Sequence, residues 1–296
     1  MTADLQIGDL RSISGFQQTL AHSFSFSGTG IHTGTYASVT VHPADVDTGR
    51  LIRVNSHTIP ARADFVVDTT RCTTLAAEGD RIHTVEHLLS ALYACQIDNA
   101  LIELEGIEIP ILDGSALPHA IAIEQSGIIA QGKLPNVLRL RQPIRLEDRG
   151  SEYSAEPAET LRIECCVEFA AWPVGNTSHI FEMGEGLYPS PRDVYRDAIA
   201  PARTFAFAQE VEHLIAAGLA RGGSLDNALI ITPPDIFSSP LRLPGEWCAH
   251  KLLDMLGDLA LVNARVSLSL KAMRPGHKGN VRIARLLLEQ YQSEQF

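Results

Sequence analysis

Short stretches in which apolar and polar residues alternate dominate the first sixty residues of the chain. The stretches HSFSFSGTGIHTG (22–34) and YASVTVHP (36–43) are typical of half-buried strands with a glycine-containing turn between them. From residue 84 the period changes, because the apolar residues of TVEHLLSALYAC (84–95) recur at intervals of three and four. We therefore predict a helix there, with Thr84 as its N-cap, and a return to a strand in NALIELEG (99–106).

A second series of elements follows a break in the pattern. Residues 116–129 are compatible with another helix, and QGKLPN (131–136) carries the Gly and Pro typical of a linker. Strands are then predicted within VLRLRQPIRLED (137–148) and LRIECCVEF (161–169), and a proline-rich loop over about 183–203. The chain therefore divides into two candidate domains.

The last third of the sequence alternates helices and strands. EVEHLIAAGLA (210–220) predicts a helix that stops at the following Gly-Gly pair, and residues 246–262 give the strongest helical pattern of this half. RVSLSLKA (265–272) predicts a strand, and a final helix is expected to begin near Asn280. A helix followed by a strand thus occurs in both halves. This indicates either a duplicated α+β unit or two independent occurrences of a helix–strand order that is common in proteins.

The composition narrows the class of protein. The chain has 296 residues, of which 45% are hydrophobic and 20% are charged, as in a globular protein with a sizeable core. Its net charge of −11 argues against general nucleic-acid binding, although a local basic pocket can still hold a small anion. The five cysteines form no Cys-x-x-Cys motif, and the N-terminus lacks a signal-peptide pattern, so we expect a cytoplasmic protein with reduced thiols.

Two segments carry the pattern of a metal-assisted hydrolase. His250 and Asp254 of HKLLD are four residues apart, so they share a helix face and can converge on one ion, with Asp258 one turn further. In HTVEH, His87 can serve as a third ligand while the adjacent Glu86 acts as a base. Taken alone, HKLLD is more typical of a His–Asp surface pair on an amphipathic helix, and HTVEH alone is ambiguous.

Weaker signals accompany these two segments. GHKGN (276–280) places a histidine between glycines on a predicted loop, and RTFAF (203–207) places Thr204 before an aromatic residue. His83 and His87 are also four residues apart, but the zincin pattern His-Glu-x-x-His is absent. A structural or surface role is expected for the remaining histidines: His22, His32, His42, His57, His119, His179 and His213.

Eight segments, in the same order and at compatible spacing, resemble the UDP-3-O-acyl-N-acetylglucosamine deacetylases, the zinc amidases of lipid A synthesis. They are SFSGTGIHTG (25–34), TVEHLLSAL (84–92), IDNALIELEG (97–106), EIPILDGSA (108–116), ARTFAF (202–207), GGSLDNALI (222–230), HKLLDMLGDL (250–259) and GHKGN (276–280). Nearly the whole chain is covered. The departures, at Trp247, Cys248 and Lys278, affect no implied ligand and bear only on substrate and inhibitor preference.

The resemblance implies a role for each of nine residues. The zinc ligands would be His87, His250 and Asp254, and Glu86 would be the general base. His277 would be the protonated partner that stabilises the oxyanion or protonates the leaving amine. The remaining implied roles are a hydrogen bond to the tetrahedral intermediate from Thr204, support of charged His277 by Asp258, and substrate contacts by Lys251 and Phe205. His83 has no role in the family pattern.

The resemblance also implies the fold and the reaction. We expect an α+β fold of two similar domains, 1–133 and 134–296, with helices packed between two sheets and a small insert in each domain. The metal helix would span 246–262 and a β-α-β insert about 205–232. The expected reaction is zinc-dependent removal of the 2-acetamido acetyl group from an acylated UDP-sugar by a monomer that has no membrane span, with Fe²⁺ as an alternative metal. The alternatives are a zinc amidase for another acetamido or peptide substrate, and an inactive homologue acting as a scaffold.

Overall fold

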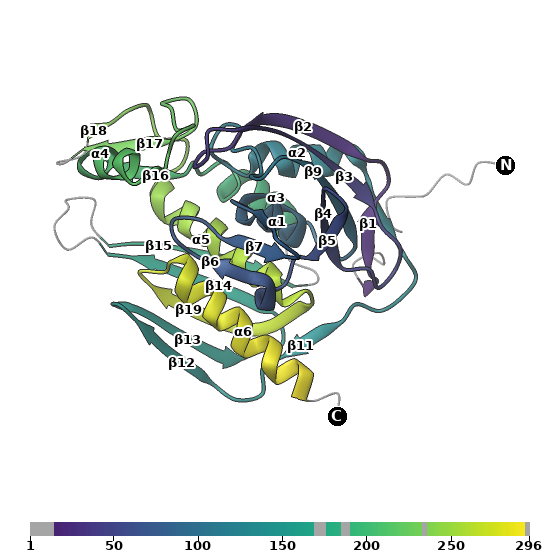
Figure 1. Cartoon of the computed structure of the whole chain (residues 1–296). Helices are drawn as coiled ribbons and strands as arrows, with labels where there is room; N and C mark the ends of the chain where they lie inside the picture. Colours follow the sequence, from purple (N-terminus) through teal and green to yellow (C-terminus); the bar gives the residue numbers. More distant parts are fainter. Residues whose placement is uncertain (1–14, 169–175, 185–189, 233–235, 294–296) are drawn as a thin grey trace.

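Two β-sheets enclose a layer of helices. The structure is a computed structural model that describes residues 15–168, 176–184, 190–232 and 236–293. Figure 1 shows one sheet on the right and above, the other below, and helices between them. This arrangement confirms the expected α+β class.

The first sheet has the strand order β2-β3-β9-β4-β5, in which β9 and β4 are parallel and the other neighbours antiparallel. Its strands are β2 (Phe24–Thr29), β3 (Tyr36–Pro43), β4 (Arg50–Val54), β5 (His57–Pro60) and β9 (Ala100–Glu105). Along β3, the side chains of Ala37, Val39 and Val41 are buried and their neighbours are more exposed, as the alternating pattern predicts. One face of the sheet therefore packs on the core.

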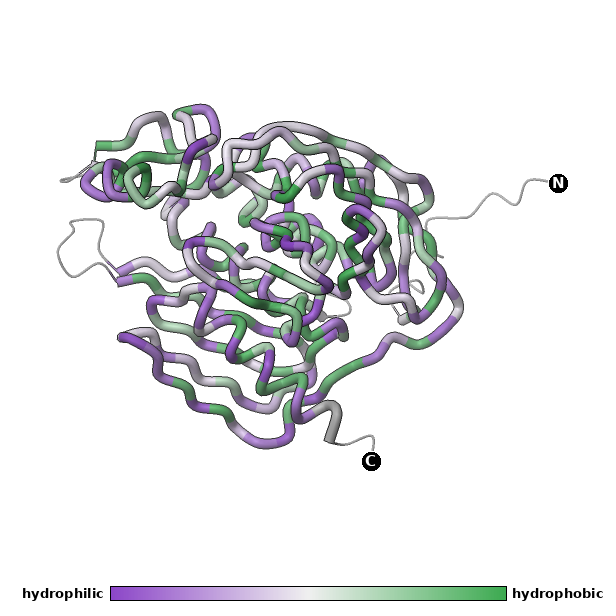
Figure 2. Tube along the Cα trace, in the orientation of Figure 1, coloured by the Kyte–Doolittle hydropathy of each residue, from purple (hydrophilic) through white to green (hydrophobic). Residues whose placement is uncertain are grey.

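The second sheet repeats this topology with the order β12-β13-β19-β14-β15, in which β19 and β14 are parallel and the other neighbours antiparallel; β11, off this path, is also parallel to β19. Its strands are β12 (Ile144–Asp148), β13 (Ser151–Pro157), β14 (Leu161–Val167), β15 (Thr177–Met183) and β19 (Arg265–Met273), with β11 (Val137–Arg139) paired to β19. The alternation of hydropathy along its strands is visible in Figure 2. The two sheets thus share one strand order, while the division at 133/134 stays a prediction.

The helices fill the space between the sheets. They are α1 (Glu86–Ala94), α2 (Leu117–Ser126), α3 (Pro191–Ala198), α5 (Glu246–Leu259) and α6 (His277–Ser293), and a 3₁₀ turn (Ala260–Val262) extends α5. Every residue of α1 is buried, and so is every residue of α5 except Lys251. Polar residues on these two helices are therefore held away from bulk water, which is costly unless they have partners.

A glycine allows α1 and α5 to approach closely. A Cβ atom at Gly257 of α5 would lie only 2.1 Å from the carbonyl oxygen of Glu86, so a side chain there would push the helices apart. Because Glu86 begins α1 and Gly257 lies in the last turn of α5, this contact brings the start of α1 beside the end of α5. The close packing places residues of the HTVEH and HKLLD segments side by side.

Smaller units complete the fold. A sheet of β6 (Val66–Asp68), β7 (Thr74–Ala77) and β8 (Asp80–Ile82) precedes α1, next to a 3₁₀ turn (Ala63–Phe65), and β1 (Gln18–Leu20) pairs with β10 (Ile128–Ala130). The β-α-β insert consists of β16 (Phe205–Phe207), α4 (Ala208–Ala216) and β17 (Leu229–Thr232), and β18 (Ile236–Phe237) follows it. In Figure 1 the insert projects at the upper left, away from the two main sheets.

Several boundaries differ from the sequence-based predictions. Thr84 does not cap α1, because Val85 takes the N-cap position and the Thr84 hydroxyl donates to Glu108 instead. The predicted loop over 183–203 contains α3, and residues 185–189 lie outside the described part. Helix α4 ends at Ala216, before the Gly-Gly pair, and α6 begins at His277 rather than near Asn280. Among the described residues, no helix is long and apolar enough to cross a membrane.

Candidate active site

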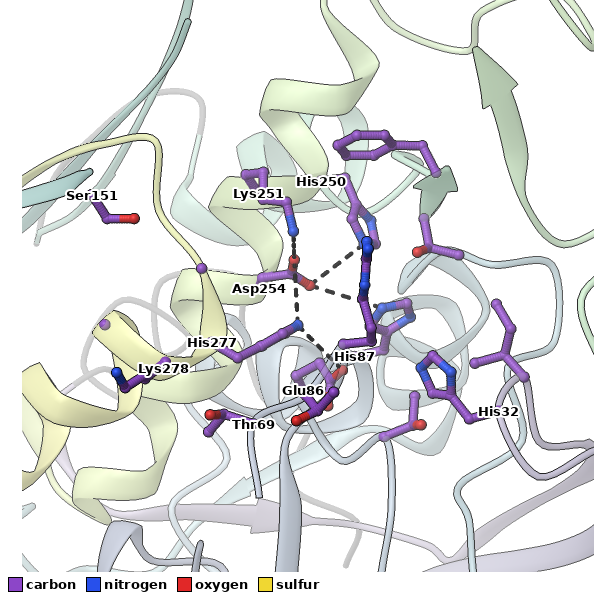
Figure 3. A pocket seen from close by; sticks show the side chains of 18 of the residues that line it. His32, Thr69, Glu86, His87, Ser151, His250, Lys251, Asp254, His277 and Lys278 are labelled. Atoms are coloured by element: carbon purple, nitrogen blue, oxygen red, sulfur yellow. Dashed lines mark hydrogen bonds and ion pairs between the residues drawn. The ribbon is translucent and has the colours of Figure 1, made fainter. Parts of the chain in front are cut away.

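A cavity of about 460 Å³ opens between the two halves of the chain and is lined by residues from both. The wall includes eight of the nine residues singled out above: Glu86, His87, Thr204, Phe205, His250, Lys251, Asp254 and His277. Asp258, the ninth, lies behind His277 and is fully buried. Figure 3 shows the labelled members of this group gathered around the cavity from three helices, α1, α5 and α6.

Three buried side chains converge in a pattern that fits a metal ion. His250 Nε2 lies 3.5 Å from Asp254 Oδ1, and His87 Nε2 lies 4.0 Å from the same oxygen. A tetrahedral ion with ligand bonds of about 2.0–2.1 Å would hold its ligand atoms about 3.3 Å apart. The three groups therefore need to move only slightly to bind one ion.

The hydrogen bonding of these residues supports the same interpretation. The His250 Nδ1–H donates to the carbonyl oxygen of Ala202 at 3.1 Å, which leaves Nε2 with a free lone pair. Asp254 Oδ1 is buried and accepts no hydrogen bond from the described residues. A buried oxygen without a hydrogen-bond partner is energetically unfavourable, and a bound metal ion would provide the missing partner. Burial also lowers the pKa of His87 and His250, which favours the neutral imidazole that a metal requires.

Asp254 keeps its negative charge in this setting. Burial opposes ionisation, but the Lys251 ammonium and the neighbouring imidazoles hold the pKa of the Asp254 carboxyl well below its usual range. Lys251 Nζ donates to Asp254 Oδ2 at 3.0 Å, while Oδ1 faces the histidines. The chemistry of the donor set, two neutral imidazoles and one carboxylate, thus fits a divalent metal that keeps an open position.

Glu86 lies beside the three clustered side chains but is not one of them. It is the first residue of α1, and its Oε1 lies 3.7 Å from His277 Nε2 across the cavity. Burial raises the pKa of its carboxyl to about 8, against the attraction of the His277 cation. A carboxyl with a pKa close to neutral pH can both take and release a proton during a reaction.

His277 has the opposite character. Burial by itself lowers the pKa of its imidazole, but three carboxylates, Asp258 foremost, outweigh that cost and raise the pKa to about 9. Its Nδ1–H donates to Asp258 Oδ2 at 2.9 Å, so its Nε2 points toward Glu86 and Asp254. The cavity therefore brings a carboxyl and an imidazole, both with raised pKa values, to within 3.7 Å of each other.

The segment carrying Thr204 is fixed by backbone hydrogen bonds from both directions. The Thr204 N–H donates to Gly114 O at 2.8 Å, and its carbonyl accepts from the Leu229 N–H at 2.8 Å. Next to it, the Phe205 ring lies 6.2 Å from the His250 ring and 5.6 Å from Lys251 Nζ, a distance suited to a cation–π contact. Thr204, Phe205 and Lys251 form the cavity wall on the side of the insert.

Comparison with known proteins decides the family. A sequence model described as UDP-3-O-acyl N-acetylglycosamine deacetylase matches residues 17–289. This chain belongs to that deacetylase family. Proteins named UDP-3-O-acyl-N-acetylglucosamine deacetylase are similar to it along most of their length. The one from Myxococcus xanthus is 37% identical over 94% of this chain and 88% of its own, and the one from Aquifex aeolicus 37% over 92% and 93%.

One histidine of this deacetylase lines the cavity although its sequence context predicts no role there. His32, expected to be structural, lines the cavity, and Glu108 holds its loop by accepting from the N–H groups of His32 and Thr33. A signal was present, since both segments belong to the quoted family motifs. His83, in contrast, interacts with Thr74 Oγ1 and does not line the cavity, in agreement with its expected structural role.

Three further residues of the deacetylase face the cavity with positive charge. Arg71, Arg149 and Lys278 line it, and Lys278 also pairs with Asp148 at 3.0 Å. Only Lys278 was noted in the sequence, and only as a departure from the family pattern. A protein of net charge −11 thus carries a local group of cations beside its candidate active site.

Proposed function

We infer that this chain deacetylates a UDP-linked, 3-O-acylated N-acetylglucosamine, hydrolysing its 2-acetamido group and releasing acetate as a step of lipid A biosynthesis. The observation that carries this function is the convergence of His87, His250 and Asp254 with Glu86 and His277 in one cavity. The family match over residues 17–289 and the names of the similar proteins support the substrate. Acetate release from the acylated UDP-sugar by purified protein tests it, and no release would refute it.

We propose that the ion held by His87, His250 and Asp254 is zinc, one per chain, with Fe²⁺ as the alternative. Two imidazoles, one carboxylate and an open position are typical of catalytic zinc. When bound, the metal would supply Lewis-acid polarisation of the amide carbonyl. Metal analysis of protein purified without oxygen distinguishes zinc from iron.

The chain's own residues would move the protons. Glu86 takes a proton from the attacking water while the water oxygen forms a bond to the amide carbon. His277 supplies a positive charge beside the developing oxyanion and gives its Nε2 proton to the leaving nitrogen as the C–N bond breaks. The Thr204 hydroxyl donates to the tetrahedral intermediate. Acetate and the free amine result, and the proton on Glu86 returns to solvent or to His277.

Two cationic regions suit the two halves of an anionic substrate. Lys251, with Phe205, lies beside the ligand cluster and would contact the sugar region. Arg71, Arg149 and Lys278 line the same cavity and would offset the charge of the diphosphate. We propose that this local charge lets an acidic protein bind a dianionic substrate.

The pH profile of kcat/KM should be bell-shaped, because Glu86 loses its negative charge at low pH and His277 loses its positive charge at high pH. Activity rises with pH as Glu86 loses its proton, and it falls near pH 9 as His277, whose pKa is raised to about 9, loses its own. The profile is measured by acetate release for the native protein and for His277→Gln. A descending limb that is unchanged in His277→Gln would remove His277 from the acid role.

The insert favours a lipid-bearing substrate over other acetamido or peptide compounds. Helix α4 has no buried residue, and Ile215 on it is 59% exposed although it is apolar. Phe205, at the start of the insert, lines the cavity. We propose that the uncovered apolar residues of the insert shelter the 3-O-acyl chain, since each methylene removed from water contributes about 0.8 kcal/mol.

Charging this surface should weaken binding of the acylated substrate much more than binding of an unacylated one. Leu214→Glu and Leu219→Glu are made separately, because only one of the two side chains need face the acyl chain. The measurement is KM for both substrates, with Glu212→Gln on the exposed face of α4 as the control. If both leucine variants fold and bind acylated substrate like the native protein, neither α4 nor the turn after it lines the acyl site.

We propose the cytoplasm as the compartment and a monomer as the active form. All five cysteines are free thiols, which suits a reducing compartment. One chain supplies every residue of the candidate site, so the site needs no second copy. Sedimentation of the active protein tests the monomer.

A further inference from the structure

Thr73 lies between the candidate base and the His277–Asp258 pair. It is fully buried, and it directly precedes β7 of the small sheet that comes before α1. Its backbone N–H donates to Glu86 Oε2 at 3.1 Å. Its hydroxyl donates to Asp258 Oδ1 at 2.5 Å, across 185 residues of sequence. One residue thus holds two functional carboxylates that come from different halves of the chain.

The hydroxyl has only one proton, and the geometry assigns it to Asp258. Thr73 Oγ1 also lies 3.4 Å from His277 Nδ1, but that nitrogen already donates to Asp258 Oδ2 at 2.9 Å. Short hydrogen bonds from a hydroxyl to a carboxylate are among the strong ones. The Thr73–Asp258 bond is therefore the fixed link, and the contact with His277 is secondary.

The Asp258 carboxylate is held at both of its oxygens. Oδ2 accepts from His277 Nδ1 and from Asn280 Nδ2, each at 2.9 Å, and Oδ1 accepts from Thr73. Asn280 is itself fixed, because its Oδ1 accepts from the Tyr153 hydroxyl at 2.9 Å. Without the Thr73 hydroxyl, Oδ1 would be a fully buried acceptor that has lost its donor, and the carboxylate could rotate away from His277.

We propose that Thr73 is a positioning residue that fixes the distance and orientation between the Glu86 carboxylate and the His277 imidazole. The proposal rests on the proposed function, since it assumes that these two groups exchange protons with one substrate. Its backbone N–H sets the position of Glu86, and its hydroxyl sets the plane of Asp258 and thereby of the imidazole. Displacements of the reacting groups by about 1 Å can cost about 100-fold in rate, so such a residue affects turnover without touching the substrate.

The test compares three variants of the metal-loaded enzyme. Thr73→Val keeps the shape and the backbone N–H but removes the hydroxyl, Thr73→Ser restores the hydroxyl, and Thr74→Val removes the neighbouring buried hydroxyl, which interacts with His83 instead. We expect Thr73→Val to lose about 10–100-fold in kcat with unchanged KM and metal content. Thr73→Ser and Thr74→Val should keep most of the native kcat.

A second measurement does not depend on turnover. In ¹⁵N-histidine-labelled protein, the resonance of the His277 Nδ1 proton reports its hydrogen bond to Asp258. We expect it to shift in Thr73→Val and to stay in place in Thr74→Val. If Thr73→Val does not fold, Thr73→Ala is measured in the same way.

The outcomes separate this proposal from the proposed function. Native protein that releases no acetate refutes the function, whereas the His277 resonance still decides the role of Thr73. Native kcat in Thr73→Val, an equal loss in Thr73→Ser, a loss of metal, or an unmoved His277 resonance would each overturn the positioning role. A selective loss of kcat with rescue by serine supports it.

Discussion

Alanine in place of His87, His250 or Asp254 is expected to abolish metal binding and acetate release together. The three side chains supply the convergent set of ligand atoms, which lie within 4.8 Å of one another. Removing one ligand of three leaves a site with too few donors to hold a divalent ion against solvent. Metal content of the dialysed variants, measured beside activity, checks this prediction.

A matched control separates loss of a ligand from loss of any histidine–aspartate pair. His57 also pairs with an aspartate, Asp80, at 2.6 Å, but on strand β5 and partly exposed to solvent. His57→Ala should therefore keep native metal content and activity. A ligand variant that retains full metal occupancy would contradict its assignment, even if its activity were lost.

The two ligand helices were predicted from local patterns, and that prediction holds because local and tertiary signals agree there. The spacing of His250 and Asp254 requires only one helix, and α5 provides it from Glu246 to Leu259. His87 approaches His250 and Asp254 only because α1 packs against α5. No periodicity of the sequence predicts that contact between two helices. Gly257 allows that contact, but a single glycine within a helical pattern does not predict close packing of two helices.

The missed helix α3 had local signals that the proline content obscured. Pro191 stands at the first helical turn, where its missing N–H costs nothing, and the Ser190 side chain accepts from the Asp193 N–H as an N-cap. The high proline content of residues 183–203 is typical of a loop, and it outweighs these signals in a prediction from sequence. A proline that follows a serine was the more informative pattern.

Residues that act through distant contacts could not be found from sequence. Thr73 belongs to the segment RCTTL, which has no motif of its own, and its partner Asp258 is 185 residues away. Asn280 lies in the quoted GHKGN motif, but its role depends on Asp258 and Tyr153, which come from other elements. Only the assembled fold shows that these polar groups are satisfied by one another.

Glu86→Gln is expected to retain metal and to lose about 10²–10⁴-fold in kcat, the usual contribution of a general base. The amide has nearly the same shape as the carboxylate, and its oxygen can still accept from the Thr73 N–H, so the fold around α1 should persist. It cannot take a proton from water, which the native carboxyl can do because burial raises its pKa to about 8. The measurements are kcat, KM and metal content of the purified variant.

The comparison with Asp254→Ala gives this result its meaning, because both residues are buried acids of the same cavity. Asp254→Ala should lose metal and activity, whereas Glu86→Gln should lose activity alone. Glu103→Gln, a partly exposed glutamate on β9 that pairs with His42, should change neither quantity. If Glu86→Gln releases the metal, Glu86 is a ligand and a different residue must take the proton from water. If it keeps both metal and native kcat, the carboxylate beside His277 has no part in the proton transfer.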